Sequence, residues 1–117
     1  MARVSTYLNF PRSTEEAFLF YKSVFGGEFS GPGIMRFGDI PGGSDGQPPL
    51  SHEDLQLIMH IELPILGGHV LMGTDAPESM GFNLHGGNNV HIQLEPDTRE
   101  ETLRLFNGLS EGGKVSI

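Results

Sequence analysis

The stretch VSTYLNFPRSTEE, residues 4–16, decides the fold of this chain. Residues 4–10 alternate between two faces, which is typical of a strand with one buried face. Pro11 ends this strand, and Ser13 with Glu16 then forms a capping box, the pattern that begins a helix. Apolar residues continue at helical spacing until Gly26-Gly27 ends the helix. The sequence therefore predicts a strand over 4–10 and a helix over 13–25.

The same pattern recurs near the C-terminus. Thr98 and Glu101 form a second capping box, and the separations agree, since 98 − 13 = 85 and 101 − 16 = 85. An alternating segment, 89–95, precedes this box and predicts another strand, and Gly112-Gly113 follows its helix. Fixed spacing indicates internal duplication. Because strand, turn and helix with glycine ends are common, the pattern alone leaves coincidence open as well.

Two further strands are predicted between the repeated segments. Residues 55–63 alternate, with Ile58 on the polar face, and a Gly-Gly turn leads into a strand over 69–74. One broken strand is expected within 28–37 and a long loop over 38–54. The result is a β-α-β-β-β order.

The expected architecture is one α+β domain over 1–117. A first module would occupy 4–74, and a second would begin over 89–117 with a strand, a helix and the start of a strand at 114–117. If the repeat is real, the second of these paired βαβββ modules is incomplete at the C-terminus.

Composition excludes several functions. The 117 residues carry 7 Lys and Arg against 15 Asp and Glu, a net charge of −8. Nucleic acids and anionic membranes need clustered positive charge, so neither is expected as a partner. The absence of cysteine excludes disulfides, thiolate zinc sites and cysteine nucleophiles. The sequence shows neither an apolar run of spanning length nor a signal peptide, so a cytoplasmic location is expected.

Several segments resemble the PhnB-like proteins of the vicinal oxygen chelate superfamily, which includes glyoxalase I, bleomycin-resistance proteins and extradiol dioxygenases. The segments that carry this resemblance are Tyr7-Leu8-Asn9-Phe10, Thr14-Glu15-Glu16-Ala17-Phe18, Phe20-Tyr21-Lys22-Ser23-Val24-Phe25-Gly26-Gly27, Met59-His60, Met72-Gly73-Thr74-Asp75-Ala76-Pro77 and Leu109-Ser110-Glu111-Gly112-Gly113-Lys114-Val115. The resemblance implies the glyoxalase/bleomycin-resistance-like fold, in which curved sheets of paired βαβββ modules enclose a cavity completed in a homodimer. Such proteins are also labelled 3-demethylubiquinone-9 3-methyltransferase by similarity. This chain lacks a glycine-rich nucleotide-binding loop after its first strand, so methyltransferase chemistry is disfavoured.

The resemblance also bears on metal binding. Metal-dependent relatives use a His on the first strand of each module and a carboxylate on the last. Carried over to this chain, the first His position falls on or beside Ser5, and the first carboxylate position falls near Met72. The second His position matches His91, and the last carboxylate would lie beyond Ile117. We therefore predict no family-type metal centre and no cofactor, although a divalent ion held through other ligands stays open.

The candidate site lies on the polar faces of the predicted strands. His60 and Glu62 share one face and could meet His91, which would supply the alternative metal ligands. The candidate ligand-binding residues are Ser5, Tyr7, Asn9, His60, Glu62, Met72, His91 and Gln93. No catalytic residue is assigned, and a solvated sheet face is the plainer interpretation of several of them. His52, His69 and His85 are expected as surface histidines.

The preferred function is binding of a small molecule in a concave, sheet-lined cavity. A metal-dependent lyase, isomerase or dioxygenase of the same superfamily is the alternative, and a partner-binding protein is a further one. A homodimer is expected because a half-barrel sheet needs a partner to cover it.

Overall fold

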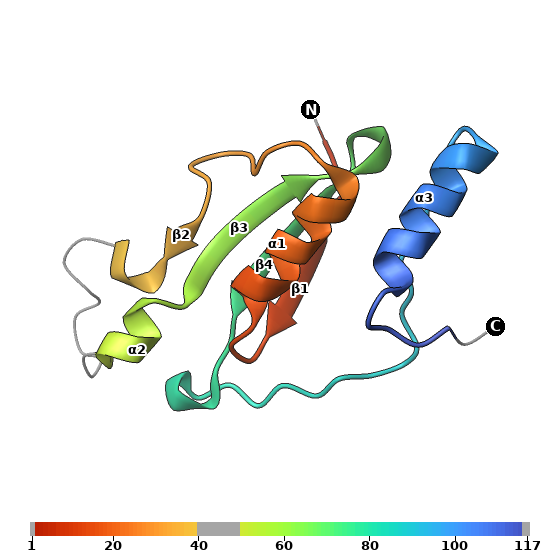
Figure 1. Cartoon of the computed structure of the whole chain (residues 1–117). Coiled ribbons are helices and arrows are strands. Elements are labelled where there is room, and N and C mark those ends of the chain that lie inside the picture. Colours follow the sequence, from red (N-terminus) through yellow and green to blue (C-terminus); the bar gives the residue numbers. More distant parts are fainter. Residues whose placement is uncertain (1, 40–49, 116–117) are drawn as a thin grey trace.

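The computed structural model describes residues 2–39 and 50–115. This part of the chain forms four strands and three α-helices, which are labelled in Figure 1. Their order is β1 (Thr6–Phe10), α1 (Thr14–Phe25), β2 (Met35–Arg36), α2 (His52–Leu55), β3 (Ile58–Pro64), β4 (Val70–Asp75) and α3 (Arg99–Ser110). None of the helices within the described ranges combines the length and the apolar character that crossing a bilayer requires.

The four strands form one sheet in the order β1-β4-β3-β2. β1 runs parallel to β4, and the other neighbouring pairs are antiparallel. Helix α1 makes the crossover after β1 and packs on β3 and β4, while α3 lies beside α1 (Figure 1). The predicted α+β class is confirmed. We call residues 6–75, with their β-α-β-β-β order and the short α2 inserted before β3, the sheet unit.

The core of the sheet unit lies between α1 and the sheet. Phe18 is fully buried and packs with four buried aliphatic side chains, Ile58, Ile61, Leu63 and Leu71. The Phe18 ring meets the rings of Phe10 and Tyr21 edge to face. Gly73 lets α1 approach β4 closely, since a Cβ atom there would lie 2.5 Å from Cε1 of Phe18. The helix and the sheet therefore pack at a distance that only glycine permits at this position.

Helix α1 begins as predicted but is capped differently. Ser13 is its N-cap residue, yet its side chain makes no capping hydrogen bond to any described residue. Instead, Oδ1 of the buried Asp75 accepts hydrogen bonds from the backbone N–H and the hydroxyl of Thr14, at 3.1 and 2.8 Å. Oδ2 of Asp75 also accepts the Ile58 N–H at 2.8 Å. The expected capping box is wrong at Ser13 because a carboxylate from the end of β4 holds both the helix start and the start of β3.

Strand β3 begins later than the predicted 55–63 strand. Residues up to Leu55 belong to α2, so part of the expected 38–54 loop is helical, and residues 40–49 lie outside the described part. Ile58, placed by alternation on the polar face, is buried in the core. The pairing of β2 with β3 shifts register between Met35 and Arg36, which breaks the strict alternation along β3. Within the predicted 28–37 strand, only Met35–Arg36 forms a strand.

The segment that follows the sheet unit departs most from prediction. Residues 89–95 form no strand in the described structure, and Val90 is 82% exposed. An alternating segment becomes a strand only when another strand satisfies its backbone, and β1 pairs only with β4 among the described strands. Residues 114–115 are not in a strand either, and 116–117 lie outside the described residues. The expected start of a second sheet is therefore not seen.

Helix α3 is predicted correctly, with Thr98 as its N-cap. The Thr98 hydroxyl accepts the Glu101 N–H at 3.1 Å. The helix packs beside α1 with Leu105 buried, and Arg104 donates a hydrogen bond to the Val24 carbonyl at 2.8 Å. We call residues 82–115, the extended stretch together with α3, the C-terminal segment.

Candidate functional site

The candidate site lies on the sheet face opposite α1. Side chains alternate along strands, so residues of β1, β4 and β3 that turn away from the core form rows across this face. One row is set by the register, in which Met72 of β4 pairs with Tyr7 of β1 and with Glu62 of β3. Asn9 pairs with Thr74 one step along. Four of the predicted site residues therefore come from three neighbouring strands.

A chain of hydrogen bonds runs along this face. The hydroxyl of Tyr7 lies 3.4 Å from Nδ1 of His60. Nε2 of the same ring lies 2.9 Å from Oε1 of Glu62. Ser30 completes the chain, since its hydroxyl donates to Oε2 of Glu62 at 3.1 Å and its backbone N–H donates to the Glu62 carbonyl at 3.0 Å. We call these four residues the polar relay.

The polar relay becomes less exposed from Tyr7 to Glu62. Tyr7 is 51% exposed, whereas the side chains of His60 and Glu62 are 27% and 21% exposed. The hydrogen bond from His60 lowers the pKa of the Glu62 carboxyl, and the bond from Ser30 and the charge of Arg3 act in the same direction against the effect of burial. Glu62 is thus held as a carboxylate that faces an imidazole.

A cavity of about 540 Å³ adjoins this face beside β1. Tyr7 and Asn9 form part of its wall, and Phe82, Leu84 and His85 from the C-terminal segment form another part. His85, expected as a surface histidine, therefore borders the same space as two predicted site residues. The cavity combines apolar side chains with amide, phenol and imidazole groups, the mixture found in small-molecule sites.

One cluster of charges holds the turn before Phe82 in place. Arg12 donates a 2.9 Å hydrogen bond to Oδ1 of Asp54, and the Ser79 hydroxyl donates to Oδ2 at 2.6 Å. The Ser79 and Arg12 hydrogen bonds both lower the pKa of the Asp54 carboxyl. Arg12 also pairs with Glu78 at 3.3 Å. These contacts join the start of α1, helix α2 and the turn at Glu78–Met80, so they position one wall of the 540 Å³ cavity.

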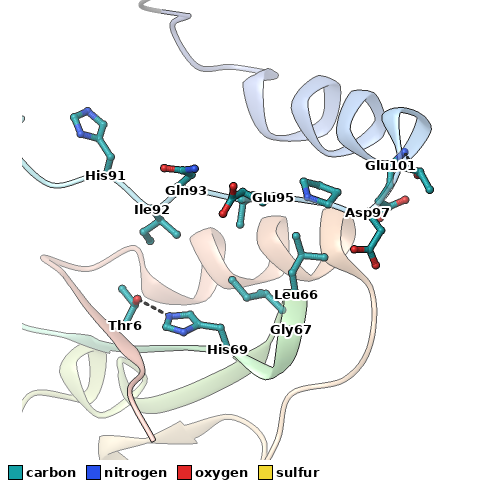
Figure 2. Close-up of a pocket in the computed structure, with 14 residues that line it drawn as sticks. Thr6, Leu66, Gly67, His69, His91, Ile92, Gln93, Glu95, Asp97 and Glu101 are labelled. Carbon is teal, nitrogen blue, oxygen red and sulfur yellow. Dashed lines mark hydrogen bonds between the residues drawn. The ribbon is translucent and has the colours of Figure 1, made fainter.

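Two further candidates, His91 and Gln93, line a different cavity. This cavity of about 780 Å³ lies between the hairpin at 65–69 and the extended stretch of the C-terminal segment (Figure 2). In Figure 2, His91 lies at the outer end of the space, away from His69. The structure does not bring His91 to His60 and Glu62, because the segment that carries it does not join the sheet.

His69 has a structural contact that the sequence did not indicate. Its Nε2 lies 2.8 Å from the Thr6 hydroxyl, a bond drawn in Figure 2 between the hairpin and β1. Ser30 was also missed, because it lies in a stretch without strand or helix periodicity, and its contact with Glu62 depends on the tertiary fold. Ser5, the remaining candidate, is partly buried just before β1.

The residues at the implied metal positions do not fit a divalent ion. Met72 stands where the resemblance implies a carboxylate, and a thioether is a poor ligand for hard divalent ions. Ser5 stands at the implied His position and supplies only a neutral hydroxyl. Across residues 2–39 and 50–115, no three His, Asp or Glu side chains gather in an arrangement that could hold a metal ion.

Comparison with known proteins places the chain among PhnB-like folds. It superimposes on a PhnB protein from Bacillus cereus, provisionally named a 3-demethylubiquinone-9 3-methyltransferase, with a TM-score of 0.59 and 24% identity over 93% of this chain and 74% of that one. It matches the protein PA1353 from Pseudomonas aeruginosa with a TM-score of 0.77 and 31% identity over 100% of this chain and 78% of that one. The chain belongs to the same family as PA1353. No family model and no curated protein matches the sequence.

Proposed function

We propose that this chain is a small-molecule binding protein of the vicinal oxygen chelate superfamily, whose ligand lies against the sheet face that carries the polar relay. The observation that carries the proposal is the Tyr7–His60–Glu62 chain of contacts, which joins β1 to β3 across β4 and is bordered by a cavity of about 540 Å³. Polar groups held by one another on a rigid sheet are preorganised to orient a ligand.

The size and lining of the cavity support a small organic ligand. Pockets for such ligands usually measure about 300–1,000 Å³ and pair apolar walls with a few fixed polar groups. Phe82 and Leu84 supply apolar wall here, and Tyr7 and Asn9 supply hydrogen-bonding groups. A macromolecular partner would instead call for a broad, flat contact surface.

The site is proposed to work without the metal centre of metal-dependent relatives, because Ser5 and Met72 occupy two implied ligand positions. A metal enzyme that uses His60 and Glu62 remains the competing function, since both are ordinary ligands for divalent ions. Elemental analysis of protein purified without chelator separates the two. Stoichiometric zinc, manganese, iron or nickel, lost in a His60→Ala variant, would favour the enzyme.

We also propose that two copies of the chain associate. Several large apolar side chains of the C-terminal segment are exposed: Leu103, Phe106, Val90 and Ile92. Exposed apolar side chains of this size are the kind of surface that another molecule covers. Sedimentation at micromolar concentration should give a dimer, and Phe106→Asp should shift it towards monomer. A monomer at all accessible concentrations would contradict this proposal.

Binding itself is tested by a thermal-shift screen of metabolites and antibiotics. A compound that binds the folded state raises the melting temperature, and the shift grows with its concentration. We expect His60→Ala to abolish the shift. His52→Ala is the matched control, because His52 is an exposed histidine on α2, away from the sheet face. A library that stabilises nothing, or a shift equal in both variants, would count against the proposal.

A further inference from the structure

The positions of the hydrogen atoms in the polar relay follow from the chemistry of its members. A carboxylate can only accept hydrogen bonds, so the Nε2 atom beside Glu62 must carry a hydrogen and donate it. The Ser30 hydroxyl also donates to Glu62. In a neutral imidazole only one nitrogen is protonated, so Nδ1 of His60 is then an acceptor. The Tyr7 hydroxyl, 3.4 Å from Nδ1, must therefore be the donor of that bond.

This direction has a consequence for the exposed end of the relay. A hydroxyl has one hydrogen, and Tyr7 uses it on His60. The phenol oxygen then offers only lone pairs to a ligand that lies on the sheet face. When His60 takes up a proton, both ring nitrogens become donors. Nδ1–H now donates to the Tyr7 oxygen, and the hydroxyl hydrogen is free to turn towards the ligand.

We infer that Tyr7 determines the specificity of this face, accepting a hydrogen bond from the ligand while His60 is neutral and donating one once His60 is protonated. The inference rests on the proposed binding function and names the chemistry of its ligand. With His60 neutral, the face selects a small molecule with an O–H or N–H donor. Protonation shifts the preference to molecules that carry an acceptor.

The surroundings of His60 support both halves of this switch. The ionisable groups that face it are the Tyr7 phenol on β1 and the Glu62 carboxylate on β3, while its register partner on β2 is the apolar Met35. Glu62 keeps Nε2–H in place in either state, so the added proton has only Nδ1 to occupy. Arg3 acts on Glu62 through its charge. The exchange of donor and acceptor is therefore confined to the Tyr7 side of the ring.

The first test uses the free protein and needs no ligand. ¹⁵N NMR shifts of the imidazole nitrogens distinguish the two neutral tautomers. We expect His60 to be the Nε2–H form, and Glu62→Leu to lose that preference. His52 in the same spectra is the internal control, since its ring is exposed on α2. A neutral His60 protonated at Nδ1 would overturn the inference while leaving the proposed binding function untouched.

The second test measures binding of two small planar probes. Phenol donates a hydrogen bond, whereas pyridine N-oxide can only accept one. One neutral hydrogen bond changes affinity by roughly fivefold. When NMR of the same sample shows His60 to be neutral, we expect phenol to bind about fivefold more tightly than the N-oxide. When NMR shows His60 to be protonated, we expect the ratio of the two affinities to fall by a similar factor.

Two variants keep the second test decisive. Tyr7→Phe retains the ring and removes the hydroxyl, so the ratio of the two affinities should become independent of pH. His60→Gln retains Tyr7 but replaces the imidazole with a neutral amide, so the ratio of the two affinities should again be independent of pH. Equal binding of both probes at either protonation state would overturn the inference alone. Probes that leave all resonances of β1, β3 and β4 unchanged would count against the binding function as well.

Discussion

The sheet unit and the C-terminal segment begin with the same sequence pattern and reach different structures. Residues 4–10 and 89–95 both alternate, and both precede a capping box and a helix. The first becomes β1, which pairs with β4 along its whole length from Thr6 to Phe10. The second stays irregular, with Val90 almost fully exposed. Alternation therefore encodes the capacity to form a strand, and a hydrogen-bonding partner decides whether the strand forms.

The two helices show the same contrast in how they are buried. Helix α1 inserts Phe18 into a core shared with three strands, whereas α3 buries Leu105 and leaves Phe106 half exposed. Leu103 and Phe106 form an apolar stripe on α3, and they are 49% and 53% exposed. This stripe has the composition of a core without the neighbours that would make it one, which is the observation behind the proposed dimer.

The largest expected effect comes from truncating one aromatic residue in each of the helices α1 and α3. Phe18→Ala leaves a cavity in the core and should lower the free energy of unfolding by about 3–5 kcal/mol. Phe106→Ala is the matched control in α3. Because this side chain is 53% exposed, its removal should cost less than about 1 kcal/mol. Urea unfolding of both variants checks the difference. A Phe106→Ala cost that grows with protein concentration would show that a second copy covers α3.

The next effect concerns the close approach of α1 to the sheet. The Cβ added by Gly73→Ala would lie 2.5 and 2.9 Å from two carbons of the Phe18 ring. The ring is buried and cannot move aside, so we expect a loss of about 1–3 kcal/mol. Gly86→Ala in the C-terminal segment is the control, since its Cβ would have no described atom within 4 Å. Thermal unfolding should separate the two, and equal melting temperatures would contradict the tight packing.

The two capping boxes give a smaller, graded comparison. Thr98→Ala removes a cap hydrogen bond and should cost about 1 kcal/mol of α3 stability, seen by hydrogen exchange. Ser13→Ala should change little, because Asp75 holds Thr14 instead. Asp75→Asn keeps the side-chain size but places an amide against the Ile58 N–H, for an expected loss of about 1–3 kcal/mol. A Ser13→Ala cost equal to that of Thr98→Ala would show that the first box does form.

The smallest effect is the pH dependence of two ion pairs. Hydrogen bonds from Arg36 and Arg104 lower the pKa values of Glu15 and Glu101, respectively. A lowered folded-state pKa stabilises the fold above the unfolded pKa, and this stabilisation is lost as pH falls through the folded value. Glu15 joins α1 to β2, so Glu15→Gln should flatten the acid side of the stability curve slightly. Glu101 acts within α3, and Glu101→Gln should leave global unfolding unchanged. Urea midpoints across an acid pH series measure both.

Local patterns predicted the fold wherever the relevant neighbours are close in sequence. Helix α1 was expected over 13–25 and spans Thr14–Phe25, and the start of α3 after Thr98 was identified. The Asp75 cap joins residues on opposite sides of the core, so no local spacing could reveal it. The burial of Ile58 depends on a register shift against β2, which alternation in one strand cannot show.

The residues of the candidate site were also predicted best where the neighbours that they contact are close in sequence. The spacing of His60 and Glu62 placed both on one strand face, and their side chains do meet. Tyr7 lies on the same sheet face because the register of β1 with β4 places it beside Met72. Ser30 could not be found, since its contact requires the chain after α1 to fold back onto β3. His91 was assigned to the same face through a strand that does not form.

The position of β4 in the sheet sets the order in which the molecule can be built. β4 lies between β1 and β3, yet it is the last of the four strands in the chain. During synthesis, β1 therefore has no partner strand until the residues near Leu71 emerge. The N-terminus of α1 likewise lacks its cap until Asp75 emerges. Long-range closure of this kind is slow and leaves apolar surface open to other chains. Until β4 is in place, the nascent chain therefore exposes the residues of the future core, Phe18 above all, and these are the residues that need protection from contact with other chains.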